Sequence, residues 1–125
     1  MRRLMRSAIA LVLMVALAVP ADASRTLDQI KARGTLRCGV GDGLPGLAAL
    51  DGAGRWVGLD ADFCRALAAA VLNDADKVTF VPLRSAERFP ALRLDRIDVL
   101  VRNTTWTLAR EAGFNVLFAD RKSVV

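Results

Sequence analysis

The chain has no histidine and only two cysteines among its 125 residues. Without histidine there is no imidazole ligand for a metal and no histidine general base. Neither an internal repeat nor a low-complexity linker interrupts the sequence. We therefore expect no metal centre, no cofactor and no repeat architecture, and we expect a single small domain.

The first 23 residues have the pattern of a signal peptide. Three arginines lie within the first six residues, residues 7–19 are almost entirely apolar, and Ala21–Ala23 has the small-x-small pattern of a signal peptidase site. The apolar run is too short to span a bilayer comfortably, although an uncleaved anchor helix is the alternative. We expect cleavage near Ala23 and an exported mature chain from about Ser24, which meets the membrane only transiently through this segment.

The charge of the chain is mildly basic. The full sequence carries +5, and the first 23 residues hold three arginines and one aspartate, which leaves +3 for the rest. This excess is too small to indicate nucleic-acid binding, and we expect no nucleic-acid partner.

Cys38 and Cys64 are the only cysteines. In an oxidising compartment, two cysteines in a short chain favour one disulfide, and two separately buried thiols are the alternative. Cys38 lies in a predicted strand, and Cys64 lies one turn into the helix expected beside it, so a bridge is geometrically reasonable.

Helical and extended patterns alternate along the chain. We predict helices over Thr26–Arg33, Asp60–Leu72 and Ser85–Leu94, and strands over Leu36–Val40, Val78–Val81, Ile97–Val101 and Asn115–Phe118. A hairpin is expected around Asp51–Gly54. The alternation predicts an α/β fold in which right-handed βαβ units form a mostly parallel sheet with flanking helices.

The predicted helices have recognisable ends and faces. Thr26 begins a capping-box pattern, and Asp60 and Ser85 are expected to cap the other two helices. The middle helix is expected to bury one face, made of Phe63, Ala66, Leu67, Ala70 and Val71.

Three loops follow the carboxyl ends of the predicted parallel strands, where ligands bind in such sheets. They cover Gly41–Gly46, Leu83–Arg88 and Arg102–Arg110. The third loop is rich in hydroxyl and amide groups and ends in Arg110, which suits a carboxylate. The alternative is an ordinary turn in which threonines cap a helix and the arginine is solvated. Arg102 is expected to be a solvated residue on either interpretation.

Two short motifs are set aside. Gly41–Gly46 fits G-x-G-x-x-G, but it contains a proline and is followed by a hairpin rather than by the helix that a dinucleotide site requires. Leu108–Phe114 is similar to the first helix of a helix-turn-helix, but the next segment, Asn115–Phe118, is strand-like.

Five ordered segments carry a family resemblance: Thr26–Val40, Gly54–Val71, Asp74–Leu83, Glu87–Leu92 and Asp98–Arg110. They resemble the N-terminal lobe of the polar and general L-amino-acid-binding proteins that serve ABC importers, the bacterial extracellular solute-binding proteins of family 3. The resemblance implies a periplasmic-binding-protein-like lobe over residues 24–118. It also implies a periplasmic protein that binds L-amino acids and meets the membrane subunits of an importer.

The resemblance also implies a ligand site. Arg110 matches the arginine that pairs with the α-carboxylate, Thr105 matches a residue that contacts the α-amino and α-carboxylate groups, and Asn103 matches a position whose carbonyl meets the ammonium. Thr107 lies next to this set. Asp42 and Ser85 match positions that shape the side-chain pocket, with a turn residue and a helix cap as their structural alternatives.

The family has two lobes, whereas this chain stops at Val125, so we expect a truncated lobe with a divergent tail at 119–125. No enzyme activity is expected. The alternatives are an exported enzyme of the same fold, similar to cyclohexadienyl dehydratase, and a fragment without function. The enzyme would need catalytic carboxylates in the cleft, and only Asp42 is available there. Trp56 and Trp106 are expected to be packing residues.

Overall fold

The computed structural model describes residues 22–114. In chain order its elements are α2 (Asp22–Arg33), β1 (Leu36–Val40), β2 (Ala49–Leu50), β3 (Trp56–Val57), α3 (Leu59–Leu72), β4 (Val78–Pro82), α4 (Arg88–Arg93), β5 (Val99–Leu100) and α5 (Leu108–Phe114). Three predicted segments lie outside these residues: the first 21 of the 23 residues of the signal peptide, the strand Asn115–Phe118 and the tail 119–125. Within residues 22–114, no helix is long and apolar enough to cross a membrane.

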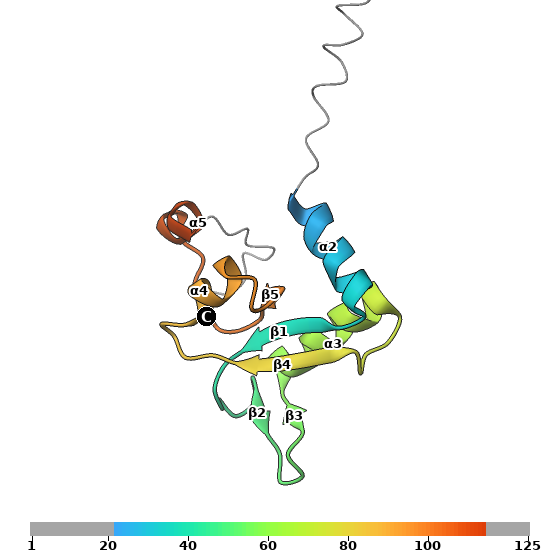
Figure 1. Ribbon diagram of the computed structural model, residues 1–125. Coiled ribbons are helices and arrows are strands. Elements are labelled where there is room, and N and C mark those ends of the chain that lie inside the picture. Colours follow the sequence, from blue (N-terminus) through green and yellow to red (C-terminus); the bar gives the residue numbers. More distant parts are fainter. Residues whose placement is uncertain (1–21, 115–125) are drawn as a thin grey trace, which may run out of the picture.

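A three-stranded parallel sheet forms the centre of the fold, with β1 between β4 and β5 (Figure 1). Cys38 lies opposite Phe80 on β4 and opposite Val99 on β5. The predicted bounds of β1 and the predicted parallel, α/β architecture are confirmed. The predicted hairpin is also present, since β2 pairs with β3 in antiparallel fashion.

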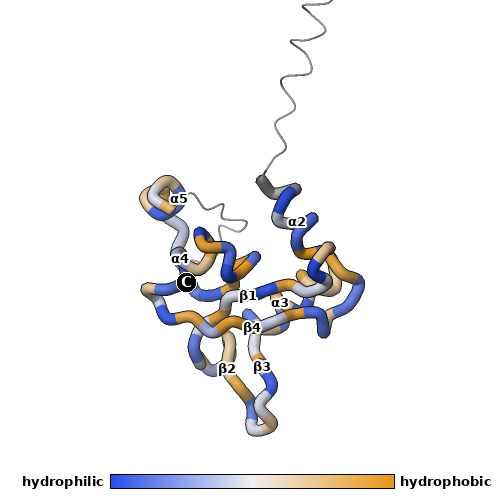
Figure 2. Tube along the Cα trace, viewed as in Figure 1, coloured by the Kyte–Doolittle hydropathy of each residue, from blue (hydrophilic) through white to orange (hydrophobic). Residues whose placement is uncertain are grey.

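Helices cover both faces of the sheet. On one face, Cys38 and Val40 of β1 pack with Cys64 of α3, which lies behind β1 and β4 in Figure 1. On the other face, Ala91 of α4 packs with Leu83 and Ile97. The hydropathy of the chain alternates accordingly, and Figure 2 shows hydrophobic and hydrophilic stretches interleaved along the elements. This alternation is expected when each element buries only one side.

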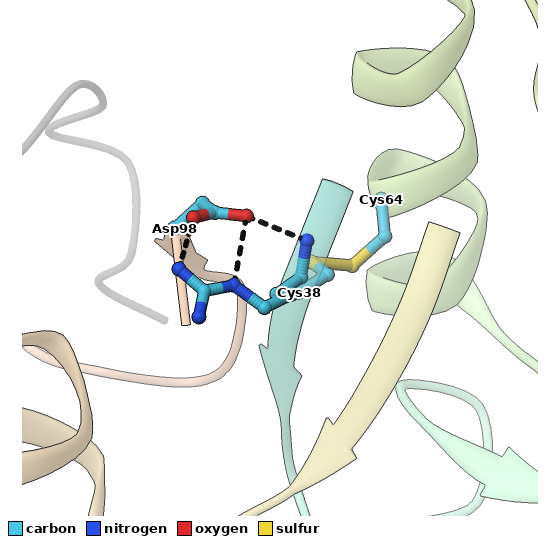
Figure 3. Close-up of a disulfide and its surroundings, with 4 residues drawn as sticks. Cys38, Cys64 and Asp98 are labelled. Atoms are coloured by element: carbon cyan, nitrogen blue, oxygen red, sulfur yellow. Dashed lines mark hydrogen bonds and ion pairs between the residues drawn. A yellow bond between two sulfur atoms is a disulfide. The ribbon is translucent and has the colours of Figure 1, made fainter. Parts of the chain in front are cut away.

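The disulfide prediction is confirmed. Cys38 and Cys64 are bonded, their Cα atoms lie 6.1 Å apart, and neither residue is exposed to solvent (Figure 3). The bond ties the central strand to α3 and lies within the hydrophobic core.

The predicted starts of the first two helices were wrong. α2 begins at Asp22, so Thr26 lies inside the helix and does not cap it. The residues between Asp22 and Thr26 include no glycine or proline, so nothing there prevents the helix from starting before Thr26. α3 begins at Leu59, so Asp60 lies in its first turn, and the preceding Gly58 occupies the cap position with a positive φ of 113°.

The predicted buried face of α3 was wrong for Phe63, Ala66 and Ala70, which are exposed, whereas Leu67 and Val71 are half-buried and pack against the core as expected. Phe63 is 53% exposed, and the fully buried residues of this helix are Ala61, Cys64 and Ala68. The disulfide sets the rotation of the helix, and small side chains on the inner face let the helix approach β1 closely. Phe63 therefore lies on the outer face.

Candidate functional site

The carboxyl ends of β1, β4 and β5 lie at one edge of the sheet because the strands are parallel. The loops after β4 and β5 touch there. Arg102, two residues after the end of β5, donates from Nη1 to the carbonyl oxygen of Leu83 at 2.6 Å and from Nη2 to the hydroxyl of Ser85 at 3.4 Å. Two of the three predicted loops therefore meet in space.

Arg110 is oriented by its own loop and by Phe89 of α4. It lies in the first turn of α5, and its Nη1 donates to the carbonyl oxygen of Thr105 at 2.6 Å. Its Cζ lies 5.9 Å from the ring centroid of Phe89. The guanidinium is thus oriented by a backbone acceptor and an aromatic ring, and it makes no ion pair with any carboxylate of residues 22–114.

Thr107 has a structural role at the start of α5. Its hydroxyl and its carbonyl both accept the backbone N–H of Arg110, at 3.2 and 3.0 Å. The alternative in which a threonine caps a helix therefore holds for Thr107, and the same contact positions Arg110.

The loop before α5 presents polar groups to solvent. Asn103 and Thr105 are exposed, and in the described part of the chain their side chains make no hydrogen bond. Thr104 is buried, at 5% exposure, and its hydroxyl accepts a 3.4 Å hydrogen bond from Nη1 of Arg88. Donors and acceptors that could meet a zwitterion are therefore available beside Arg110.

Ser85 and Asp42 lie in the other two loops. The expectation that Ser85 caps a helix was wrong, because α4 begins only at Arg88 and Glu87 occupies the cap position. The carboxylate of Glu87 accepts the backbone N–H of Arg84 at 2.9 Å and so forms a turn in which Ser85 is free to contact Arg102. Asp42 is exposed. The pKa of Arg84 is raised by a hydrogen bond with Glu87, by the charge of Glu87 and, more weakly, by the charge of Asp42.

Arg102 and Arg88 belong to the site, although the sequence argument assigned a role to neither. Arg102 is half-buried rather than solvated, and Nε of each arginine is buried without an acceptor. The Cζ of Arg88 lies 5.2 Å from the ring centroid of Phe89, which stacks on Phe114 at 4.4 Å. Burial and then the charges of Arg102 and Arg110 lower the pKa of Arg88. The only sign in the sequence that Arg102 belongs to the site was its position immediately after a predicted strand.

Two acidic residues of this region are already engaged, since Glu87 pairs with Arg84 and Glu111 accepts a hydrogen bond from Trp106. Asp60, in the first turn of α3, has its pKa raised by burial, an effect that the charge of Arg102 partly offsets. No cluster of three or more histidine, cysteine, aspartate or glutamate residues suited to a metal occurs within residues 22–114. The arrangement is therefore cationic, rich in donors and suited to holding an anion.

Several curated proteins are similar to this chain in sequence. The chain is 48% identical over 103 residues to the general L-amino acid-binding periplasmic protein AapJ of Rhizobium johnstonii, a match that covers 81% of this chain and 30% of the relative. It thus spans about a third of the length of the curated relatives it matches.

Two solved structures are similar to this chain in both sequence and fold. A periplasmic binding protein from Brucella ovis with glutathione bound is 49% identical with a TM-score of 0.69, over 71% of this chain and 28% of that one. A variant of domain 1 from TmArgBP, in an arginine-bound form, is 28% identical with a TM-score of 0.62. That match covers 69% of this chain and 64% of the other. The family model described as bacterial extracellular solute-binding proteins, family 3, matches residues 36–120, and the chain therefore belongs to this family.

Proposed function

We propose that this chain captures L-amino acids in the periplasm for delivery to an ABC importer. The observation that supports the proposal is the environment of Arg110: its guanidinium is fixed by the carbonyl of Thr105 in the loop after β5, and it lacks a carboxylate partner within residues 22–114. Such a group would bind the α-carboxylate through paired hydrogen bonds.

The neighbouring groups would complete the recognition of a zwitterion. The hydroxyl of Thr105 is free to contact the α-carboxylate, and carbonyl oxygens around Asn103 can accept from the ammonium. Ser85 and Asp42, from the other two loops, would shape the side-chain pocket. No cofactor is part of this role.

The names of the relatives support amino-acid capture. AapJ is a general L-amino acid-binding protein. The arginine-bound form of domain 1 from TmArgBP supports the idea that a single lobe of this fold can hold an amino acid. We further propose that residues 1–23 direct export, that cleavage occurs near Ala23, and that importer membrane subunits receive the ligand.

An enzyme of the same fold, similar to cyclohexadienyl dehydratase, is the competing function. It would need a carboxylate poised to act as an acid or base. Asp42 is exposed, and Asp60 is a half-buried residue at the start of α3. Neither aspartate is among the groups that orient Arg110, which favours binding without catalysis.

Calorimetric titration of the purified mature chain with a set of L-amino acids tests this proposal. Arg110→Ala should weaken binding by about thirtyfold, equivalent to about 2 kcal/mol for a charge-assisted pair. Arg110→Lys should recover only part of the loss, because lysine keeps the charge without the paired geometry. Arg93→Ala, which removes an exposed arginine at the end of α4, is the matched control and should bind as the wild type does. Absence of binding by the wild type, or equal effects of the Arg110 and Arg93 substitutions, would contradict the proposal.

A further inference from the structure

Helix α5 carries Arg110, yet it buries none of its own residues. The helix covers Leu108–Phe114, and every one of these residues keeps some contact with solvent in the described structure. Leu108, at the start of the helix, is 78% exposed. A helix of about two turns is not stable in water by itself, so it depends on tertiary contacts. The position of Arg110 therefore depends on the side chains through which α5 meets the rest of the protein.

Phe114, the last residue of α5, provides a contact with α4. Its ring stacks on the ring of Phe89, with the centroids 4.4 Å apart and an angle of 10° between the planes. Phe89 is only 6% exposed and lies in α4, a helix anchored in the core by Ala91, whereas Phe114 is half-buried. Stacked aromatic rings add a preferred geometry to the burial of apolar surface. The pair therefore constrains the orientation of α5 as well as its distance from α4.

The same Phe89 ring also contacts Arg110, whose Cζ lies 5.9 Å from the ring centroid. Arg110 and Phe114 are four residues apart in α5, a spacing that places two side chains on the same face of a helix. One face of α5 therefore meets Phe89 through both residues. A movement of α5 that separated Phe114 from Phe89 would also carry the guanidinium away from the ring.

Other contacts of Arg110 lie within its own segment of the chain. Its guanidinium donates to the carbonyl oxygen of Thr105, and its backbone N–H donates to the hydroxyl of Thr107. Both contacts would persist if the whole segment moved relative to α4. A hydrogen bond from Arg88 to Thr104 also reaches this segment from α4, but it is long at 3.4 Å. The ring stack is therefore the better defined link between α4 and the segment that carries Arg110.

We propose that Phe114 is a positioning residue for ligand binding, which holds α5 against Phe89 so that the guanidinium of Arg110 is placed to receive a carboxylate. This inference rests on the proposed function, in which Arg110 holds the α-carboxylate of an L-amino acid. Phe114 acts through Arg110 and does not need to touch the ligand. A binding group that is already placed loses less conformational freedom on binding, and the apparent affinity falls in proportion to the fraction of molecules in which the group is correctly placed. Loss of the stack should therefore weaken binding and leave the core intact.

Calorimetric titration of the purified mature chain with each of the common L-amino acids in turn tests this role. Phe114→Ala should weaken binding at least about fivefold, and by a similar factor for every ligand that binds, because all carry the same α-carboxylate. Phe114→Tyr keeps the stacked ring and should bind within about twofold of the wild type. Leu108→Ala is the matched control, since it truncates an exposed apolar residue of the same helix, and it should bind as the wild type does.

A double-mutant cycle with Arg110 separates positioning from general packing. In an Arg110→Ala background, Phe114→Ala should weaken binding by less than about twofold, because the group that it positions is gone. A residue that only stabilised the fold would weaken binding by the same factor in both backgrounds. Hydrogen exchange provides a measurement without ligand: the amides of α5 should exchange faster in Phe114→Ala than in the wild type, whereas those of β1 should be unchanged.

The outcomes separate this inference from the proposed function. Wild-type affinity in Phe114→Ala, or an equal loss in both backgrounds of the cycle, would overturn the positioning role and leave amino-acid capture intact. Absence of binding by the wild type would overturn both. A thermal melt accompanies each variant. If Phe114→Ala does not fold, Phe114→Leu takes its place, because leucine keeps the apolar bulk without a stacked ring, and wild-type affinity in that variant would equally overturn the role.

Discussion

The Asp98 carboxylate receives both the backbone N–H and the guanidinium of Arg37, each at 2.7 Å (Figure 3). Arg33, at the end of α2, also pairs with this carboxylate, whose side chain is only 2% exposed. Asp98 in turn donates its backbone N–H to the carbonyl of Arg37 at 2.9 Å. One buried acid therefore joins α2, β1 and the segment that leads into β5.

This arrangement predicts a pH-dependent loss of stability in Asp98→Asn. Burial alone would raise the pKa of Asp98, but hydrogen bonds from Arg37 and the charges of Arg33 and Arg37 lower it overall. The carboxylate therefore stabilises the fold above its unfolded pKa, near 4, and loses that effect as the pH falls through the lower folded pKa. We expect the variant to lose about 2 kcal/mol at pH 7, less than for a fully buried pair because the arginines are partly exposed.

Urea unfolding at pH 7 and pH 3 measures this effect, and the difference between wild type and variant should shrink at pH 3. Asp62→Asn is the matched control, since Asp62 is 74% exposed and pairs with Arg65 on the surface of α3. It should change stability by less than about 0.5 kcal/mol. A pH-independent difference for Asp98→Asn would contradict the electrostatic explanation.

The disulfide should contribute measurably to stability. Cys38 and Cys64 are separated by 26 residues, and closing a loop of that length stabilises by about 3 kcal/mol in the chain-entropy model. Intact mass with and without reductant should show one bond in the exported protein, and urea unfolding with reductant should show the loss. Two free thiols in the oxidised sample would refute the bond.

Elements defined by local pattern were predictable from the sequence. The segment Leu36–Val40 is short, apolar and bounded by Gly34 and Gly41, and the structure has β1 at those bounds. Parallel pairing followed from the alternation of strands with helices. The disulfide followed from the number of cysteines and the expected compartment.

Features decided by packing were not predictable in this way. Most of α3 is alanine or leucine, so several faces are apolar and periodicity does not select one, whereas the Cys64 bond does. Arg102 is held by a carbonyl at Leu83, 19 residues earlier, which no local pattern signals. At the site, the sequence indicated the edge of the sheet and Arg110, but the positions of Arg88 and Arg102 depend on their contacts with Thr104 and Leu83, which lie far from them in the sequence.

The outward orientation of Phe63 predicts that Phe63→Ser changes the free energy of unfolding by less than about 0.5 kcal/mol. The same substitution should lower the binding of a hydrophobic dye, because it removes exposed apolar surface. Phe89→Ser is the comparison, since Phe89 is only 6% exposed and should lose about 3 kcal/mol. Chemical denaturation distinguishes the two, and a large loss in Phe63→Ser would place that side chain in the core.

Gly58 should be the glycine least tolerant of a side chain among the turns around β2 and β3. It has a φ of 113°, and an added Cβ would lie 2.5 Å from the backbone oxygen of Leu47. Backbone cannot yield as the end of a flexible side chain can, so Gly58→Ala should cost at least about 2 kcal/mol. Gly54→Ala is the matched control, because Gly54 also has a positive φ, of 76°, but an added Cβ would meet nothing within 4 Å. That variant should lose only about 1 kcal/mol, from strain alone. Equal losses in urea unfolding would show that the contact with Leu47 adds nothing to the strain of the positive φ.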